Sequence, residues 1–306
     1  MDIVLRFVEL VPVTLVQSLI YAFVAFGVML PFRLLGFPDL TSEGSFPIGG
    51  CICGAMIAAG FSPGLAMLCG TLGGFLAGSA TAMVSLKFRI SSLLAGIIIV
   101  TMVYSVNLRI MGRSNIALFQ FDNLFDLVWP GMNSSLWHKG AFLGIGVILL
   151  VVAAFAFLRT EKGIAFRAVG ANLDMAEAQG IHSWGHIVGG FGVAGALCAF
   201  AGALVVQSQG FSDVNIGFGV LINGLAAVII GELITGRGSV LRQLLAPIVG
   251  AIVYFQIISV CLAMGLAPTD LKFATGALVL LMLAAPSLLP GRRRGALTRD
   301  RMHETT

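Results

Sequence analysis

The polar side chains of this sequence that could bind a ligand are few, and they lie within or directly beside apolar runs. A polar group inside an apolar segment costs free energy, so it usually serves a purpose. It either lines the path of a polar solute or forms a hydrogen bond between helices, and both roles are open for each residue. The substrate-path candidates are Asp39, Thr41, Ser42, Glu43, Asn107, Asn223 and Gln256, with Gln207 and Gln209 nearer the end of a run.

Residues for catalysis or metal binding do not come together in the sequence. The 4 His residues stand at positions 138, 182, 186 and 303, and the 5 Cys residues lie in apolar stretches without a CxxC pair. Such Cys residues are typical of packed small side chains, not of a disulfide framework. A GxxxxGK[ST] phosphate loop is missing, because "GRGS" at 236–239 lacks the lysine. The sequence therefore predicts neither an enzyme nor a cofactor or metal bound by this chain.

One polar stretch is continuous, "RAVGANLDMAEAQGIH" at 167–182. Asn172 is a good N-cap, because its side-chain oxygen can accept a hydrogen bond from a free N–H of the first turn. Asp174 places a negative charge where the helix dipole favours it, and Gly180 suits a left-handed helix end. The pattern predicts a helix of about two turns, which is marginal alone in water. We expect another surface to pack against it; an ordinary solvated loop helix is the alternative.

The composition indicates whether the elements that hold these residues lie in water or in a membrane. Hydrophobic residues make up 58% of the chain, charged residues 10%, and the mean hydropathy is +1.00. A soluble domain carries about 25% charged residues. The apolar runs continue over about 20 residues, which favours helices over the alternating strands of a barrel. The sequence thus predicts an all-α polytopic membrane protein, and its scattered basic residues fit membrane topology better than nucleic-acid binding.

The apolar runs predict about nine transmembrane helices, with a range of eight to ten. The second run is short and Gly-rich, so a broken or re-entrant helix is an alternative to a plain crossing. No gap between runs is long enough for a soluble domain. We expect one transmembrane domain over 1–290 and a basic tail over 291–306, with spans near 8–32, 45–60, 63–85, 91–111, 141–158, 186–207, 216–234, 241–264 and 272–289.

Basic residues indicate the orientation, because Lys and Arg stay on the cytoplasmic side. With the tail inside, counting back through nine spans places most of the Lys and Arg residues inside. The loop at about 159–185 is then cytoplasmic, and the N-terminus lies outside. The 112–140 loop faces the exterior, where its Trp and Phe residues suit the membrane interface.

Several stretches together resemble the permeases of bacterial ABC importers, in the branch that serves branched-chain amino acids, ribose-type sugars and related ligands. "RAVGAN" at 167–172, followed by small residues and Gly180, is similar to the cytoplasmic coupling loop of that family. The Gly/Ala-rich 189–204, "GFPDLTSEGSFPIGG" at 36–50 and the connection within 223–254 resemble further segments in the family's order. In the second of these, Asp39 stands where the amino-acid branch usually has Asn.

The resemblance implies a complex. It implies two permeases, two cytoplasmic ABC ATPases that use ATP and Mg, and an extracytoplasmic solute-binding protein. A homodimer is expected, since nothing in the chain marks a dedicated partner, and lipid rather than nucleic acid surrounds it. The resemblance also places the chain in the bacterial cytoplasmic (inner) membrane with a cytoplasmic C-terminus. Its ATPase-coupling residues would be Arg167, Gly170, Asn172, Asp174, Ala176, Glu177 and Gly180.

The expected function is a permease subunit that forms the translocation path for a small polar solute. A broken second helix starting near 41–45 would present N–H groups to a carboxylate, which favours an amino acid or a related compound. A sugar or nucleoside permease of the same family is the first alternative. An ion- or solute-driven secondary transporter is a weaker one, because the charges lie mostly at span ends and the capped cytoplasmic helix would have no role.

Overall fold

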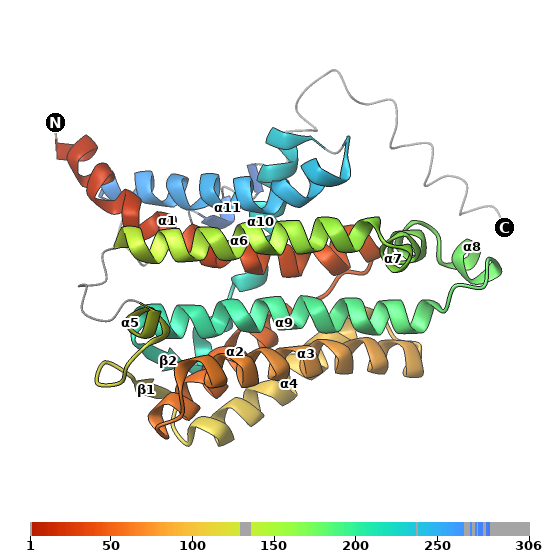
Figure 1. Ribbon diagram of the computed structural model, residues 1–306, viewed down its shortest axis with the longest axis horizontal. Helices are drawn as coiled ribbons and strands as arrows, with labels where there is room; N and C mark the ends of the chain where they lie inside the picture. Colours follow the sequence, from red (N-terminus) through yellow and green to blue (C-terminus); the bar gives the residue numbers. More distant parts are fainter. Residues whose placement is uncertain are drawn as a thin grey trace.

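The computed structural model describes residues 2–128, 136–236 and 238–265, and beyond these only 270, 273, 275–277, 280 and 281. Long helices lie side by side and form one bundle (Figure 1). Seven of the described segments are long and apolar enough to cross a membrane. This confirms an all-α polytopic membrane protein. The expected span 272–289 lies mostly outside the described residues and the tail 291–306 entirely so; the count of about nine stays a prediction.

Two short strands and two non-α helical turns interrupt the α-helices. The elements in chain order are α1 (Asp2–Met29), η1 (Leu30–Leu35), α2 (Ser42–Ala58), α3 (Pro63–Phe88), α4 (Ser92–Met111), β1 (Asn115–Ala117), α5 (Leu124–Val128), α6 (Leu136–Arg159), α7 (Glu161–Ala171), α8 (Leu173–Ala178), α9 (Ser183–Gln209), β2 (Phe211–Asp213), η2 (Val214–Gly217), α10 (Val220–Thr235) and α11 (Val240–Ala263).

The first long helix ends in a π-helical turn, η1. Pro31 stands at its start, and a proline has no N–H for the regular helical ladder. Gly36 then takes a left-handed conformation (φ 75°), and the N–H groups of Gly36 and Phe37 both donate to the Pro31 carbonyl. The chain leaves the helix here and turns back into the bundle.

The second segment is short, as the sequence predicted, but it forms one uninterrupted helix, α2. Residues 36–40 are not helical, and α2 starts only at Ser42 and is 17 residues long. The first turn of α2 faces the middle of α9, since a Cβ on Gly195 would lie 3.1 Å from Ser45 Oγ. The far end of α2 reaches the strands, because Gly54 lies against Ser212 of β2. Helix α2 therefore begins inside the bundle and runs to the β1–β2 end.

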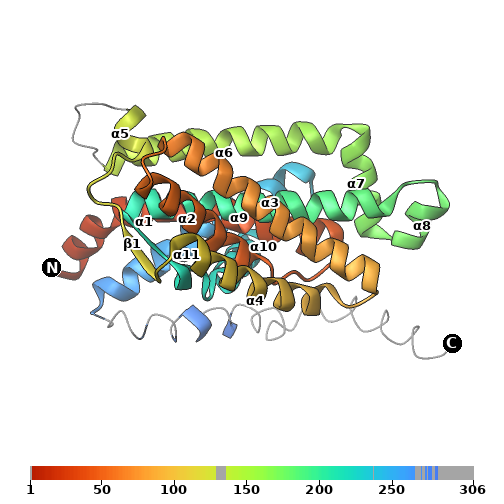
Figure 2. The ribbon, with the colours of Figure 1, turned by 90° about the horizontal axis from the view of Figure 1, so that it is seen from below.

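The predicted span 216–234 is not one continuous helix: η2 ends at Gly217, and α10 follows after Phe218 and Gly219. Strand β2, directly before η2, pairs with β1 of the 112–140 loop. Helix α10 starts at Val220, after the left-handed Gly219. Gly217 packs against Glu43 and Pro47 of α2, so the two short helices start side by side. They lie near the middle of the molecule (Figure 2) and leave it in opposite directions.

The segment α1–α2–α3 is repeated in the opposite direction by α9–α10–α11. Helix α3 packs on α9 and α2, and α11 packs on α1 and α10 in the same way. The two long helices α1 and α9 are antiparallel, and both are followed by a left-handed glycine: Gly36 at φ 75° and ψ 15°, Gly210 at φ 75° and ψ 16°. The structure is therefore an inverted repeat, which no pattern in the sequence indicated.

Glycines bring the helix backbones of each repeat together. A Cβ on Gly49 would lie 2.0 Å from the Ala199 carbonyl oxygen, and one on Gly231 would lie 1.7 Å from that of Ala246. Gly70, Gly74 and Gly78 of α3 likewise approach main-chain atoms of neighbouring helices. Van der Waals contact between such surfaces supports association inside a membrane, where lipid is as apolar as the helices.

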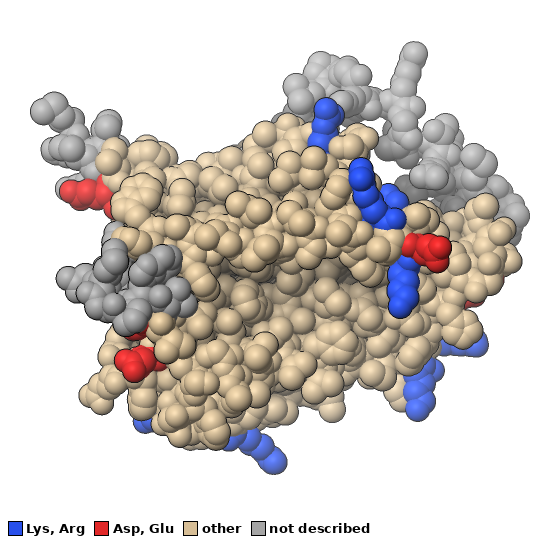
Figure 3. Space-filling model, in the orientation of Figure 1, with Lys and Arg blue, Asp and Glu red and all other residues tan. Residues whose placement is uncertain are grey.

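Basic residues gather at the end of the bundle that carries α7 (Figure 3). The ends of η1, α3 and α6 and the start of α11 lie at that end (Figure 1). The Lys and Arg residues expected in the cytoplasm, as far as the structure describes them, thus share one end. They are Arg33, Lys87, Arg89, Arg159, Lys162, Arg167 and Arg242.

Candidate functional site

The predicted coupling segment consists of two helices. Helix α7 is capped by Thr160, whose hydroxyl accepts from Gly163 N at 3.2 Å. Helix α8 is capped by Asn172, whose Oδ1 accepts from Met175 N at 3.0 Å, and Gly180 is left-handed (φ 81°) after its end. The predicted caps and the two-turn helix are confirmed. The separate helix α7 before it was not predicted.

The coupling candidates are divided between these helices. Arg167 and Gly170 belong to α7, where Arg167 is half-buried, and its Nε has no hydrogen-bond partner within the described chain. On α8, Ala176 is buried and Asp174 is exposed. Glu177 is exposed as well, but its carboxylate accepts a hydrogen bond from the Ser183 hydroxyl at the start of α9. Asp174 is therefore the freest of the acidic candidates to meet a partner.

Met175 is a candidate that sequence reasoning missed. Its apolar side chain is 63% exposed on α8, in a segment whose other exposed residues are mostly polar. A polarizable, flexible thioether suits an adaptable contact with another protein. Its position in the first turn, three residues after the capping Asn172, was the signal available in the sequence.

Replacing Asn172 by alanine is expected to destabilise α8 by about 1 kcal/mol, because the cap of Met175 N is lost. Limited proteolysis of the purified permease measures this as faster cleavage between α7 and α9. Asn172→Ser keeps a capping oxygen and serves as the matched control. Equal cleavage rates for Asn172→Ala and Asn172→Ser would contradict the capping role.

A buried polar cluster precedes α2. The Asp39 carboxylate accepts hydrogen bonds from Thr41 N at 2.8 Å and from the Thr41 hydroxyl. The Thr41 hydroxyl also lies 2.8 Å from that of Thr81 on α3. The Ser92 hydroxyl of α4 donates to the Pro38 carbonyl at 2.7 Å. Asp39 is 5% exposed and Thr41 fully buried, so this segment is held by two neighbouring helices.

The start of α2 does not present the free N–H groups that the sequence suggested. The N–H of Glu43 donates to the Leu40 carbonyl, and those of Gly44 and Ser45 donate to the Thr41 carbonyl. The half-buried Glu43 lies beside the segment directly before α10, since a Cβ on Gly217 would lie 2.3 Å from the Glu43 carbonyl oxygen. A carboxylate at a helix N-terminus is stabilised by the dipole, so Glu43 joins the two short helices.

The other path candidates lie in separate places. Asn107 of α4 is 1% exposed, and neither of its polar atoms has a partner among the residues described. Asn223 Oδ1 accepts from the Tyr254 hydroxyl at 2.7 Å, and Gln256 Nε2 lies 3.4 Å from the Thr14 hydroxyl. The structure thus brings Ser42, Glu43 and the Asp39 cluster together and leaves the remaining candidates elsewhere in the bundle.

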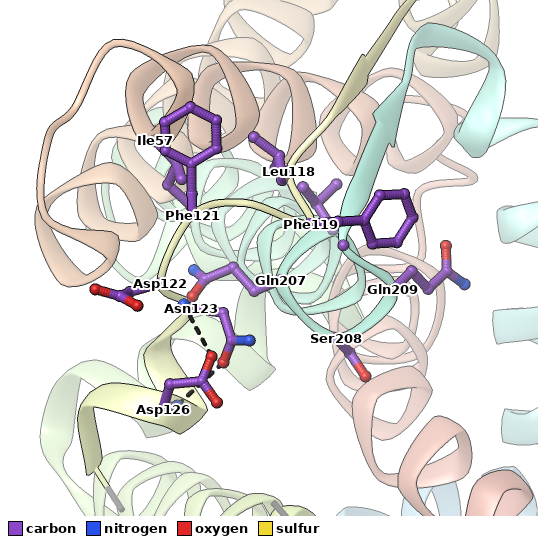
Figure 4. A pocket seen from close by; sticks show the side chains of 12 residues that line it. Ile57, Leu118, Phe119, Phe121, Asp122, Asn123, Asp126, Gln207, Ser208 and Gln209 are labelled. Atoms are coloured by element: carbon purple, nitrogen blue, oxygen red, sulfur yellow. Dashed lines mark hydrogen bonds between the residues drawn. The ribbon is translucent and has the colours of Figure 1, made fainter. Parts of the chain in front are cut away.

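A cavity of about 200 Å³ opens at the β1–β2 end, opposite α8 (Figure 4). Its wall includes Gln207 and Gln209 of α9 and the carboxylates of Asp122 and Asp126. Gln207 is buried, and its Oε1 accepts a hydrogen bond from Leu124 N at 2.8 Å. Gln209 is exposed. Both glutamines thus lie in the last turn of α9, at the wall of this cavity.

Comparison with known proteins agrees with these features. The chain is 38% identical to the tyrosine transport system permease protein of Clostridioides difficile (strain R20291), over 89% of this chain and 90% of the relative. It is 27% identical to the galactofuranose transporter permease protein YtfT of Escherichia coli (strain K12), over 87% and 76%. No solved structure matches significantly. The family model "Branched-chain amino acid transport system / permease component" matches residues 12–285, and the chain belongs to this family of ABC permease subunits for amino-acid or sugar-type solutes.

Proposed function

We propose that this chain forms the translocation path of an ATP-driven, binding-protein-dependent importer in the bacterial inner membrane. Family membership over nearly the whole chain carries the proposal. The gathering of basic residues around α7 and α8 supports a cytoplasmic position for that end. The N-terminus and the β1–β2 end then lie outside, and 1–290 act as one transmembrane domain.

The partners in this proposal follow from the family. A separate cytoplasmic ABC ATPase binds ATP and Mg and contacts α7 and α8, with Asp174 and Met175 as the exposed groups. An extracytoplasmic binding protein delivers the solute, and a second copy of the chain completes the membrane part. The permease itself carries out no covalent chemistry.

An amino acid or a related compound is the favoured solute. The relative of 38% identity is a tyrosine transport permease, which supports an amino acid. Two carboxylates, Asp39 and Glu43, stand where the short helices meet, and this charge suits an ammonium group better than a carboxylate. The galactofuranose relative keeps a sugar-type solute as the second candidate.

Reconstitution tests the proposal. The permease and its ATPase are reconstituted in liposomes, with ATP on the side of the membrane that carries the ATPase and the binding protein on the other side. Uptake of radiolabelled L-tyrosine, L-leucine and D-galactose is then measured. We expect ATP-dependent uptake of an amino acid that stops when either partner is left out. Asp39→Asn removes the negative charge at nearly constant shape, and we expect it to reduce amino-acid uptake about tenfold or more, as for loss of a charged hydrogen bond.

The controls separate the alternatives. ATP-dependent uptake of the sugar alone would move the solute class to sugars. Uphill uptake by the permease alone, driven by a proton or sodium gradient, would contradict the ABC mechanism. Unchanged uptake in Asp39→Asn would show that the Asp39 carboxylate does not contact the transported solute.

A further inference from the structure

The π-helical turn η1 lies between the coupling segment and the two short helices. Helix α7 packs directly on it: a Cβ on Gly170 would lie 1.7 Å from the Leu34 carbonyl oxygen, and one on Gly36 would lie 3.5 Å from the Gly170 oxygen. The two backbones therefore touch without a side chain between them. A displacement of α7 cannot be absorbed by side-chain rearrangement at this contact.

One continuation of η1 leads to α2. The chain passes from Gly36 to the buried Asp39 and Thr41 and enters α2 at Ser42. Only residues 36–41 separate η1 from α2, and hydrogen bonds to Thr81 of α3 and from Ser92 of α4 hold this segment in place. A shift of η1 along its axis reaches the cluster around Asp39 and, through it, the first turn of α2.

A second continuation leads to α10. Arg33 Nη2 lies 2.6 Å from Glu232 Oε2, and the two residues are 199 positions apart in the chain. The Glu232 side chain is 9% exposed and that of Arg33 34%. A charge-assisted hydrogen bond to a nearly buried carboxylate is stronger and better defined in geometry than a pair in bulk water. It fastens α10 to η1 near the end of α10 that faces α7.

The conformation of η1 suits a moving joint. π-Helical turns are rare and occur frequently at functional sites, since their hydrogen bonds are shifted from the regular ladder. We propose that η1 is the joint through which movement of α7 and α8 reaches both short helices: through residues 34–41 to α2 and through Arg33 and Glu232 to α10. Arg33 and Glu232 are positioning residues, and the inference rests on the proposed coupling to an ATPase.

Distance measurements on the complete complex test the joint without a known solute. Spin labels carried by genetically encoded non-natural residues are placed at Ala178 on α8 or at Ile222 on α10, each with a reference label at Leu72 on α3; all three positions are exposed. The complex of permease and ATPase is measured without nucleotide and after trapping with ATP and orthovanadate. In the wild type we expect trapping to change both distances.

Arg33→Ala is expected to keep the change at Ala178 and to lose at least half of the change at Ile222. The exchange variant Arg33→Glu with Glu232→Arg is expected to restore it, which a general loss of folding would not permit. Lys87→Ala removes a basic residue from the same end of the bundle and is the matched control. If the distance to Ile222 changes as much in Arg33→Ala as in the wild type, the proposal that η1 is the joint is overturned. A wild type that changes only at Ala178 would overturn it as well, whereas no change at either position would contradict the coupling to the ATPase itself.

Discussion

Replacing Gly170 by alanine is expected to reduce ATP-driven uptake at least about tenfold while ATP hydrolysis continues. The added Cβ would lie 1.7 Å from the Leu34 carbonyl oxygen, so α7 has to withdraw from η1. Overpacking of this kind costs about 1–3 kcal/mol, and 1.4 kcal/mol corresponds to a factor of about ten. Uptake and phosphate release are measured in parallel in proteoliposomes that contain the complete complex.

The control for this variant is Gly189→Ala, a substitution in a neighbouring helix, α9, where a Cβ meets no atom within 4 Å. It adds the same methyl group and should leave uptake unchanged. Equal uptake by the two variants would show that the contact between α7 and η1 plays no part in transport. Loss of both uptake and hydrolysis in Gly170→Ala alone would point to failed assembly with the ATPase instead of uncoupling.

Replacing Gly49 by alanine is expected to lower the stability of the folded permease by about 1–3 kcal/mol. Gly49 lies where three backbones meet: its own Cβ would fall 2.0 Å from the Ala199 oxygen of α9, and a Cβ on Gly70 of α3 would fall 2.6 Å from the Gly49 oxygen. Both neighbours are main-chain atoms within helices, so the clash is relieved only by separating α2 from α9.

The measurement is the midpoint of thermal unfolding in detergent, followed by size-exclusion chromatography after heating. Gly64→Ala in the first turn of α3 is the matched control, because a Cβ there meets nothing within 4 Å. Alanine favours a helix over glycine by about 1 kcal/mol, so the control should be neutral or slightly stabilised. A midpoint for Gly49→Ala equal to that of Gly64→Ala would contradict the close approach of these helices.

The features that the sequence predicted well have local causes. The membrane class follows from runs of apolar side chains, and the caps of α8 depend on Asn172 and Gly180, which flank that short helix. Likewise, the small residues of α2 are compatible with its close packing against neighbouring helices. Each of these could be predicted because a few neighbouring residues determine it.

The features that the sequence did not reveal depend on contacts between distant segments. The sequence indicated only that Arg33 is a basic residue on the cytoplasmic side. Its pairing with Glu232 depends on the position of α10 in the bundle, which no local pattern determines. The segment before α10 contains residues 211–213, which pair with residues 115–117, and such three-residue strands leave no recognisable pattern. The inverted repeat leaves no sequence pattern because equivalent positions in the two halves carry different residues. Gly202 contacts the backbone of Phe46 in one half, and Gly224 contacts Val28 in the other.

The opposed directions of α2 and α10 have an electrical consequence. Each helix carries a macrodipole of about half an elementary charge at either end, with the positive end at its N-terminus. Both positive ends meet inside the bundle, and the negative ends point towards opposite faces. A voltage across the membrane therefore acts on the two dipoles with opposite sign, and symmetric movement of the pair transfers no net charge. The resting potential of a cell therefore gives this pair of dipoles no preferred direction of symmetric movement.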